Sequence, residues 1–166
     1  TEGKPRKRIL ENDEQTRLIE ACALSDNIYL MPMVQFSIET SVRQGELLKI
    51  KYEHINFKKR LVTLYDTKNG EDRIIPLSRK AFGILCSLPR QFNGRMFPMT
   101  RHSLKFWWRQ ALKRAKIEGL RWHDLRRHAI TIMFEEKNLD VPTVQLISGH
   151  KNPMVLLNTY TKLNPE

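Results

Sequence analysis

Residues 123–133 read HDLRRHAITIM, and this stretch combines an apolar stripe with a cluster of basic side chains. At helical spacing the apolar stripe consists of Leu125, Ala129, Ile132 and Met133. His123 and Arg126 lie three positions apart and share a different face. A helix that packs through its apolar stripe would present these two side chains along the edge of a cleft. Because any basic helix can contain an HxxR pair on a solvated face, the motif needs support from the rest of the chain.

Helical periodicity extends outward from this stretch over most of the sequence. Helices are predicted over residues 13–24, 28–38, 42–49, 78–87, 101–115, 123–137, 141–148 and 153–161. Ser41, Ser78 and Asp140 precede three of these helices and are expected to cap them. Gly149 follows residues 141–148, where a left-handed residue would end the helix.

The residues between positions 50 and 77 have a different pattern. Residues 50–55, 61–65 and 73–77 are short segments rich in β-branched residues, and DTKNG at 66–70 contains an Asn-Gly pair typical of hairpin turns. The sequence therefore predicts a mainly α fold with a small three-stranded antiparallel sheet (α+β). Residues 1–8 are expected to form a basic arm or linker, and 9–166 a single domain.

The charge of the chain favours a polyanionic partner. Its 29 basic and 18 acidic residues give a net charge of +11, and bound Lys and Arg release counterions from nucleic acid. The alternative is a merely basic surface.

With no signal peptide and no apolar run long enough to cross a membrane, we expect a cytoplasmic protein without a membrane partner. Cys22 and Cys86 are expected to be buried free thiols. The absence of CxxC, HExxH or an acidic ligand cluster predicts no metal and no cofactor.

Three further features could carry chemistry. Arg43 and Glu46 stand at i, i+3, so the carboxylate could hold the guanidinium in place. Gly149 fixes His150 in the turn that follows its helix. Tyr160 lies near the end of the last predicted helix. Each has an ordinary alternative: a surface ion pair, a turn residue and a packing tyrosine.

Taken together, these pieces resemble the tyrosine recombinases of the phage-integrase type. The similar runs are TSVRQGELLKIKYEHIN (40–56), TKNGEDRIIPLS (67–78), HDLRRH (123–128), LISGH (146–150) and NTYTKL (158–163). They occur in the family's order and at about its spacing, from about Arg8 to Leu163. The resemblance implies the fold of a tyrosine recombinase catalytic domain.

The resemblance also implies a catalytic set, which consists of Arg43, Lys68, His123, Arg126, His150 and Tyr160, supported by Glu46. In that family the two arginines and the last histidine bind the scissile phosphate. The histidine of HxxR is the usual base, the hairpin lysine donates a proton to the departing 5′-oxygen, and the tyrosine is the nucleophile. Forked guanidinium groups suit a transition state whose charge spreads over equatorial oxygens.

The implied function is site-specific DNA recombination through a 3′-phosphotyrosyl intermediate, without metal or ATP. The implied partner is double-stranded DNA, bound by a homo-tetramer that passes through a Holliday junction; the free fragment is expected to be a monomer. Such enzymes usually clamp DNA with an additional N-terminal domain, which we expect to be absent from these 166 residues. The alternatives are a type IB topoisomerase, a noncatalytic DNA-binding module of the same fold and a structural RNA-binding protein.

The sequence departs from the commonest family pattern at a few positions. Tyr160 follows His150 by ten residues, one more than usual, and the extra residue is expected within 151–155. Ser148 and Gln44 replace commoner residues, but neither is expected to touch an assigned catalytic group. His128 is expected to be structural or to contact the DNA backbone. His54 and His102 carry no functional prediction.

Overall fold

The computed structural model describes residues 6–65 and 71–160. In chain order the elements are α1 (Glu14–Ala23), α2 (Leu30–Thr40), α3 (Gln44–Lys49), the 3₁₀ turn η1 (Tyr52–His54), β1 (Ile55–Asn56), β2 (Leu61–Leu64), β3 (Arg73–Pro76), α4 (Arg79–Ser87), α5 (Arg101–Ala115), α6 (Asp124–Glu135), α7 (Val141–Ser148) and α8 (Pro153–Thr159). The predicted mainly α fold with one small sheet is confirmed.

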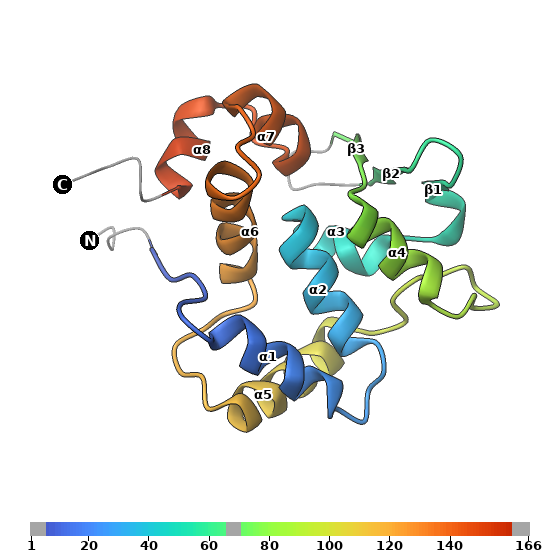
Figure 1. Cartoon of the computed structure of the whole chain (residues 1–166). Helices are drawn as coiled ribbons and strands as arrows, with labels where there is room; N and C mark the ends of the chain where they lie inside the picture. Colours follow the sequence, from blue (N-terminus) through green and yellow to red (C-terminus); the bar gives the residue numbers. More distant parts are fainter. Residues whose placement is uncertain (1–5, 66–70, 161–166) are drawn as a thin grey trace.

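Helix α6 links the two ends of the molecule (Figure 1). At one end α1 packs on α5, and at the other α7 packs on α6 and α8, while α2 packs against the middle of the fold through α6 and α4. The main core includes Phe36, Phe97 and Leu104, all fully buried. A smaller apolar cluster lies between α6, α7 and α8. The HxxR motif at the start of α6 is thus supported by helices from both halves of the sequence.

The sheet has the order β1-β2-β3, with both pairs antiparallel. Val62 lies opposite Ile75, and both side chains are fully buried, which fixes the register of the pair. The first strand is shorter than predicted, because residues 52–54 form a 3₁₀ turn in which the backbone N–H of Lys51 donates to Nδ1 of His54. The predicted Asn-Gly turn lies outside the described residues.

Two of the three predicted helix caps are confirmed. The side chains of Ser78 and Asp140 accept hydrogen bonds from Ala81 and Thr143, and Gly149 ends α7 with φ of 80°. The prediction for Ser41 is wrong: it ends α2 in the left-handed region with φ of 62°.

Helix α3 begins only at Gln44, with Arg43 at the N-cap. The carboxylate of Glu46 accepts a hydrogen bond from the backbone N–H of Arg43 at 2.8 Å. An acid in the first turn thus gives a partner to a backbone donor at the start of the helix.

The two cysteines differ in their exposure to solvent. Cys22 is buried, but Cys86 is exposed because it falls on the outer face of α4, which corrects the prediction of two buried thiols. Trp108 is buried in the core, where its ring meets that of Trp122 edge-on. Arg6 is held by the carboxylate of Asp124 at 2.6 Å. Among the helices that the structure describes, none is both long and apolar enough to cross a membrane.

Candidate functional site

Arg126 occupies the centre of the site, on the first turn of α6. Its side chain is almost fully buried, and Nη1 donates to the backbone carbonyl of Ser41 at 2.7 Å. The left-handed conformation of Ser41 ends α2 and turns the chain toward Arg43. The bond therefore fixes one predicted phosphate-binding arginine beside the segment that carries the other.

Arg43 is joined to a buried carboxylate and to a third arginine. Its Nη1 lies 3.9 Å from Oε1 of Glu46, and Glu46 is 1% exposed. Arg73, at the start of β3, donates to both carboxylate oxygens of Glu46. Its Nε also donates to the carbonyl of Ile147, at the end of α7. One carboxylate thus connects α3 with the sheet, and Arg73 connects the sheet with α7.

His150 lies in the turn after α7, as predicted, and faces Arg126. Nη2 of Arg126 lies 3.4 Å from Nδ1 of His150, and Oγ of Ser148 lies 2.8 Å from the same nitrogen. A guanidinium has no lone pair to offer, so Nδ1 must accept. The neutral ring then carries its proton on Nε2, which leaves an N–H available for a phosphate oxygen.

The Ser148 contact corrects an expectation from the sequence. Ser148 was expected to touch no assigned catalytic group, yet its fully buried hydroxyl contacts the ring of His150 directly. Gln44, by contrast, accepts a hydrogen bond from Arg101 at 3.2 Å and contacts none of the assigned groups in the described bonds.

The cluster formed by Arg43, Glu46, Arg73, Arg126 and His150, which we call the arginine cluster, carries excess positive charge. Burial, with the nearby guanidinium groups of Arg43 and Arg73, lowers the pKa of Arg126 to about 9. Burial, followed by the charges of the same three arginines, lowers the pKa of His150 to about 4. The ring is therefore neutral at neutral pH.

One donor in the arginine cluster has no hydrogen-bond partner among the described residues. Nη1 of Arg43 is buried and makes no hydrogen bond within the described part of the chain. Its ion pair with Glu46 at 3.9 Å is too long for a hydrogen bond, and a buried donor without a hydrogen bond is costly, so a bound anion would remove that cost. Glu46 is the carboxylate that faces Arg43 and Arg73, so the arrangement suits an added anion with several acceptor oxygens.

His123 is exposed and lies just before α6, where it is the N-cap residue. Loss of water around its ring, followed by the charges of Arg126, Arg127 and Arg43, lowers its pKa. It is therefore neutral at neutral pH and able to accept a proton. The next residue, Asp124, is buried and binds Arg6 and Arg127, which anchors the start of α6.

Tyr160 is not brought to the arginine cluster. Its hydroxyl donates to Oε1 of Glu135 at 2.9 Å, and its ring lies 4.9 Å from that of Phe134. Glu135 ends α6, nine residues after Arg126, which corresponds to about 13 Å along the helix axis. Burial, then the hydrogen bond to Glu135, raises the pKa of Tyr160. In this arrangement the predicted nucleophile is held away from the predicted phosphate site.

The predicted general acid, Lys68, lies outside the described residues. The strand that follows it in the sequence, β3, is described and contacts the site. Arg73 on β3 belongs to the arginine cluster, and Glu71 lies 2.9 Å from Nζ of Lys151, in the turn after His150.

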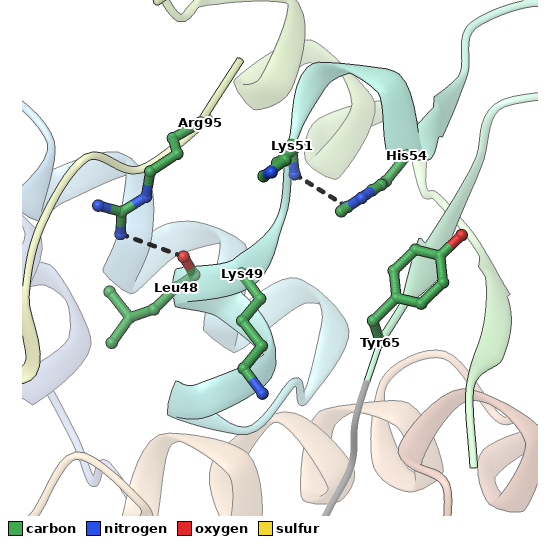
Figure 2. A pocket seen from close by; sticks show the side chains of 6 residues that line it. All are labelled: Leu48, Lys49, Lys51, His54, Tyr65 and Arg95. Carbon is green, nitrogen blue, oxygen red and sulfur yellow. Dashed lines mark hydrogen bonds between the residues drawn. The ribbon is translucent and has the colours of Figure 1, made fainter. Parts of the chain in front are cut away.

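A basic cavity of about 520 Å³ lies beside the sheet and α3 (Figure 2). Its lining residues are Leu48, Lys49, Lys51, His54, Tyr65 and Arg95. Tyr65 is the last described residue before position 71, and its ring lies 4.6 Å from that of His54. A second cavity of about 460 Å³ lies between α5 and residues 120–122, with Arg101, Lys105, Arg109 and Arg121 among its lining residues. Both cavities are lined in part by lysine and arginine side chains, and both adjoin elements of the site.

His128 is buried, its Nε2 lies 2.9 Å from Gln15, and burial lowers its pKa to about 4, so its place is structural. In residues 6–65 and 71–160, no three His, Cys, Asp or Glu side chains gather as they would around a metal ion.

Sequence reasoning missed Arg73, Ser148 and Asp124. Asp124 had a local signal, since an acid in the first turn of a basic helix favours the helix start. Arg73 had no local signal, because its partners lie on other elements. Ser148 had none either, because its contact with His150 depends on how the turn after α7 folds.

Comparison with known proteins identifies the family of the chain. The model of the phage integrase family matches residues 8–166. A shufflon-specific DNA recombinase of Escherichia coli is 39% identical over 158 residues, which cover 95% of this chain and 41% of that protein. The tyrosine recombinase XerA of Pyrococcus horikoshii is 27% identical, with 94% of this chain and 57% of that protein covered. The chain spans about half the length of these curated relatives.

Solved structures agree on the fold. The catalytic domain of bacteriophage HP1 integrase superposes with a TM-score of 0.77 at 23% identity, covering 96% of this chain and 90% of that one. A lambda integrase dimer bound to a COC′ core site gives a TM-score of 0.80 at 17% identity, covering 99% and 51%. The fold is thus that of a tyrosine recombinase catalytic domain. The chain belongs to the phage integrase family.

Proposed function

We propose that this chain is the catalytic part of a site-specific DNA recombinase that breaks and rejoins DNA through Tyr160. The observation that carries the proposal is the arginine cluster, in which the buried Nη1 of Arg43 makes no hydrogen bond within the described part of the chain. A phosphodiester offers the negative charge and the several oxygens that this cluster lacks. Membership of the phage integrase family supports the same reaction.

In the proposed reaction Arg43 and Arg126 bind the two nonbridging oxygens of the scissile phosphate, and Nε2–H of His150 donates to one of them. Fixed donors of this kind stabilise the charge that develops on the equatorial oxygens. Because His150 is held neutral, it acts as a hydrogen-bond donor and not as an acid.

The protons move at the two ends of the displaced bond. The oxygen of Tyr160 attacks phosphorus and loses its proton to His123, whose lowered pKa keeps it unprotonated. The P–O5′ bond breaks, and the 5′-oxygen takes a proton from Lys68 and leaves as a hydroxyl. A 5′-hydroxyl of the partner strand then attacks the 3′-phosphotyrosine and restores Tyr160, so the bond energy is conserved without ATP.

Tyr160 must first leave Glu135. Its raised pKa and buried ring make the described arrangement a poor one for attack. We infer that DNA binding or contact with another protomer moves Tyr160 away from Glu135 so that the tyrosine reaches the phosphate. This step makes cleavage depend on an assembled complex, which fits the proposed homo-tetramer.

The proposed partner is double-stranded DNA. The net charge of +11, the basic cavity of Figure 2 and the exposed Arg101, Lys105 and Arg109 of α5 support a phosphate-binding face. If roughly six to ten phosphates are contacted, affinity should fall about 10³–10⁵-fold between 50 and 200 mM salt.

The proposal is tested with a nicked duplex whose cleaved 5′ fragment diffuses away. The wild-type chain should accumulate as a covalent adduct that survives denaturant, and Tyr160→Phe should bind the same duplex without forming it. An adduct of undiminished yield with Tyr160→Phe would exclude Tyr160 as the nucleophile. Full activity in excess chelator is also expected; cleavage that requires added Mg²⁺ would contradict the mechanism.

The role of Lys68 as general acid is tested separately by replacing the bridging 5′-oxygen of the duplex with sulfur. A thiolate leaves without protonation, so this duplex should restore cleavage by Lys68→Ala and leave Tyr160→Phe inactive. If sulfur does not rescue Lys68→Ala, the acid is another residue.

A further inference from the structure

Arg73 joins three elements of the site, although the sequence assigned it no functional role. It donates to both oxygens of Glu46 on α3 and, through Nε, to the carbonyl of Ile147 at 3.3 Å. Its side chain is 12% exposed and that of Glu46 is 1% exposed, so the pair is shielded from water. A shielded, forked pair holds its geometry far better than a surface ion pair does.

The turn after α7 is built around the same side chain. A Cβ placed on Gly149 would lie 2.9 Å from Cζ and Nη1 of Arg73. Because Glu46 and Ile147 hold that guanidinium, a side chain at position 149 would have to displace it from the turn that carries His150. Gly149 also has φ of 80°, a backbone conformation that favours glycine.

Glu46 links Arg73 to Arg43. Oε1 of Glu46 accepts from Nη2 of Arg73 at 3.2 Å and from the backbone N–H of Arg43 at 2.8 Å. The same oxygen lies 3.9 Å from Nη1 of Arg43. A shift of this carboxylate would displace the start of α3 and the guanidinium together.

We propose that Arg73 is a positioning residue for DNA cleavage, which fixes Arg43 through Glu46 and His150 through the end of α7. The inference rests on the proposed function. It assigns the start of β3 a task distinct from that of Lys68 in the same hairpin: Arg73 sets the geometry of the phosphate-binding groups and transfers no proton.

The test uses Arg73→Lys, which keeps a positive charge beside the buried Glu46. A lysine cannot make the fork to Glu46 and also reach Ile147. At saturating nicked duplex, the single-turnover cleavage rate should fall at least about tenfold while the Kd for DNA stays within about threefold. Arg79→Lys, the same change at an exposed position just beyond β3, should leave both quantities near wild type. Cleavage by Arg73→Lys at the wild-type rate would overturn the proposal.

Two modified duplexes separate positioning from other roles. A methylphosphonate at the scissile position carries no charge and depends less on the arginines, so the deficit of Arg73→Lys should shrink on it. The bridging 5′-sulfur should not rescue the variant. An equal deficit on both the phosphate and the methylphosphonate, or rescue by sulfur, would show that Arg73 does not act through the phosphate-binding groups.

Arg73→Ala serves as a second variant, with folding followed by circular dichroism. It should cleave no faster than Arg73→Lys, because it loses the fork entirely. Faster cleavage by the alanine variant would contradict the inference. If the wild-type chain itself forms no adduct, the proposed function fails, and the inference fails with it. If the wild type cleaves and Arg73→Lys matches it, only the inference fails.

Discussion

The hydroxyl of Tyr160 donates a hydrogen bond to the carboxylate of Glu135, 2.9 Å away at the far end of α6 from Arg126. Burial and this carboxylate both raise the pKa of the phenol. The group proposed as the nucleophile is therefore held apart from the groups proposed to bind the phosphate, and each of the two sites can be altered separately.

The contact predicts that Glu135→Gln will release Tyr160. Removing the negative charge should lower the pKa of Tyr160 toward its usual value of about 10, measured as the difference in absorbance titration between Glu135→Gln and Glu135→Gln/Tyr160→Phe. Adduct formation on the nicked duplex should become faster. Glu136→Gln makes the same charge change on the neighbouring residue and should change neither quantity. Slower adduct formation by Glu135→Gln would indicate that Glu135 assists the attack of Tyr160 on the phosphate.

Ser148→Ala should weaken cleavage moderately. The hydroxyl contacts Nδ1 of His150 at 2.8 Å, and a hydrogen bond of this kind is worth about 1 kcal/mol, or about fivefold in rate. The single-turnover rate on saturating DNA is the measurement. Ser37→Ala is the matched control, since that buried hydroxyl has no hydrogen-bond partner among the described residues. Equal effects of the two substitutions would mean that the Ser148 contact does not support catalysis.

The pH dependence of cleavage should reveal His123. Its pKa lies below the usual value of about 6.5, so the neutral base persists as pH falls through that value and is lost only at lower pH. The single-turnover rate should thus decline on the acid side below pH of about 6.5, and His123→Ala should lose this decline along with most of its activity. A decline centred above pH of about 6.5 would contradict the assignment.

Stability should depend on Glu14, whose carboxylate is clamped by Arg8 through two hydrogen bonds at 2.7 and 2.6 Å. The hydrogen bonds from Arg8 lower the pKa of Glu14 to about 2. Because the folded-state pKa is depressed, this stabilisation is present above the unfolded value and disappears as pH falls toward about 2.

Glu14→Gln should therefore lower the free energy of unfolding by about 1.5–3 kcal/mol at neutral pH. In urea titrations the difference from wild type should shrink as the pH falls below about 4.5. Glu20→Gln, an exposed carboxylate on the same helix, should have little effect at any pH. A pH-independent deficit in Glu14→Gln would show that the clamp is not electrostatic.

Features with a local cause could be predicted from the sequence. The bounds of α5 match the predicted residues 101–115, and α7 has its predicted cap at Asp140 and its predicted end at Gly149. Periodicity and capping depend on residues a few positions apart, so one segment contains the whole signal. The convergence of Arg43, Arg126 and His150 followed from the family resemblance, since no local pattern links segments so far apart.

Features that depend on distant contacts could not be predicted. Arg73 meets Glu46 and Ile147 only after the sheet has packed between α3 and α7. The expected N-cap at Ser41 failed because α2 continues to Thr40 and Ser41 must turn the chain back. The docking of Tyr160 on Glu135 depends on how α8 packs across α6, which no spacing between His150 and Tyr160 reveals.

The central claim is that Tyr160 becomes covalently joined to the 3′ phosphate of cleaved DNA. The most direct measurement is mass spectrometry of the adduct trapped on the nicked duplex, after digestion of both protein and DNA. We predict a peptide that contains Tyr160 and carries the mass of the residual 3′-nucleotide, with fragment ions that place the added mass on the tyrosine. A nucleotide mass on any other residue, or cleaved DNA that carries no protein, would contradict the account.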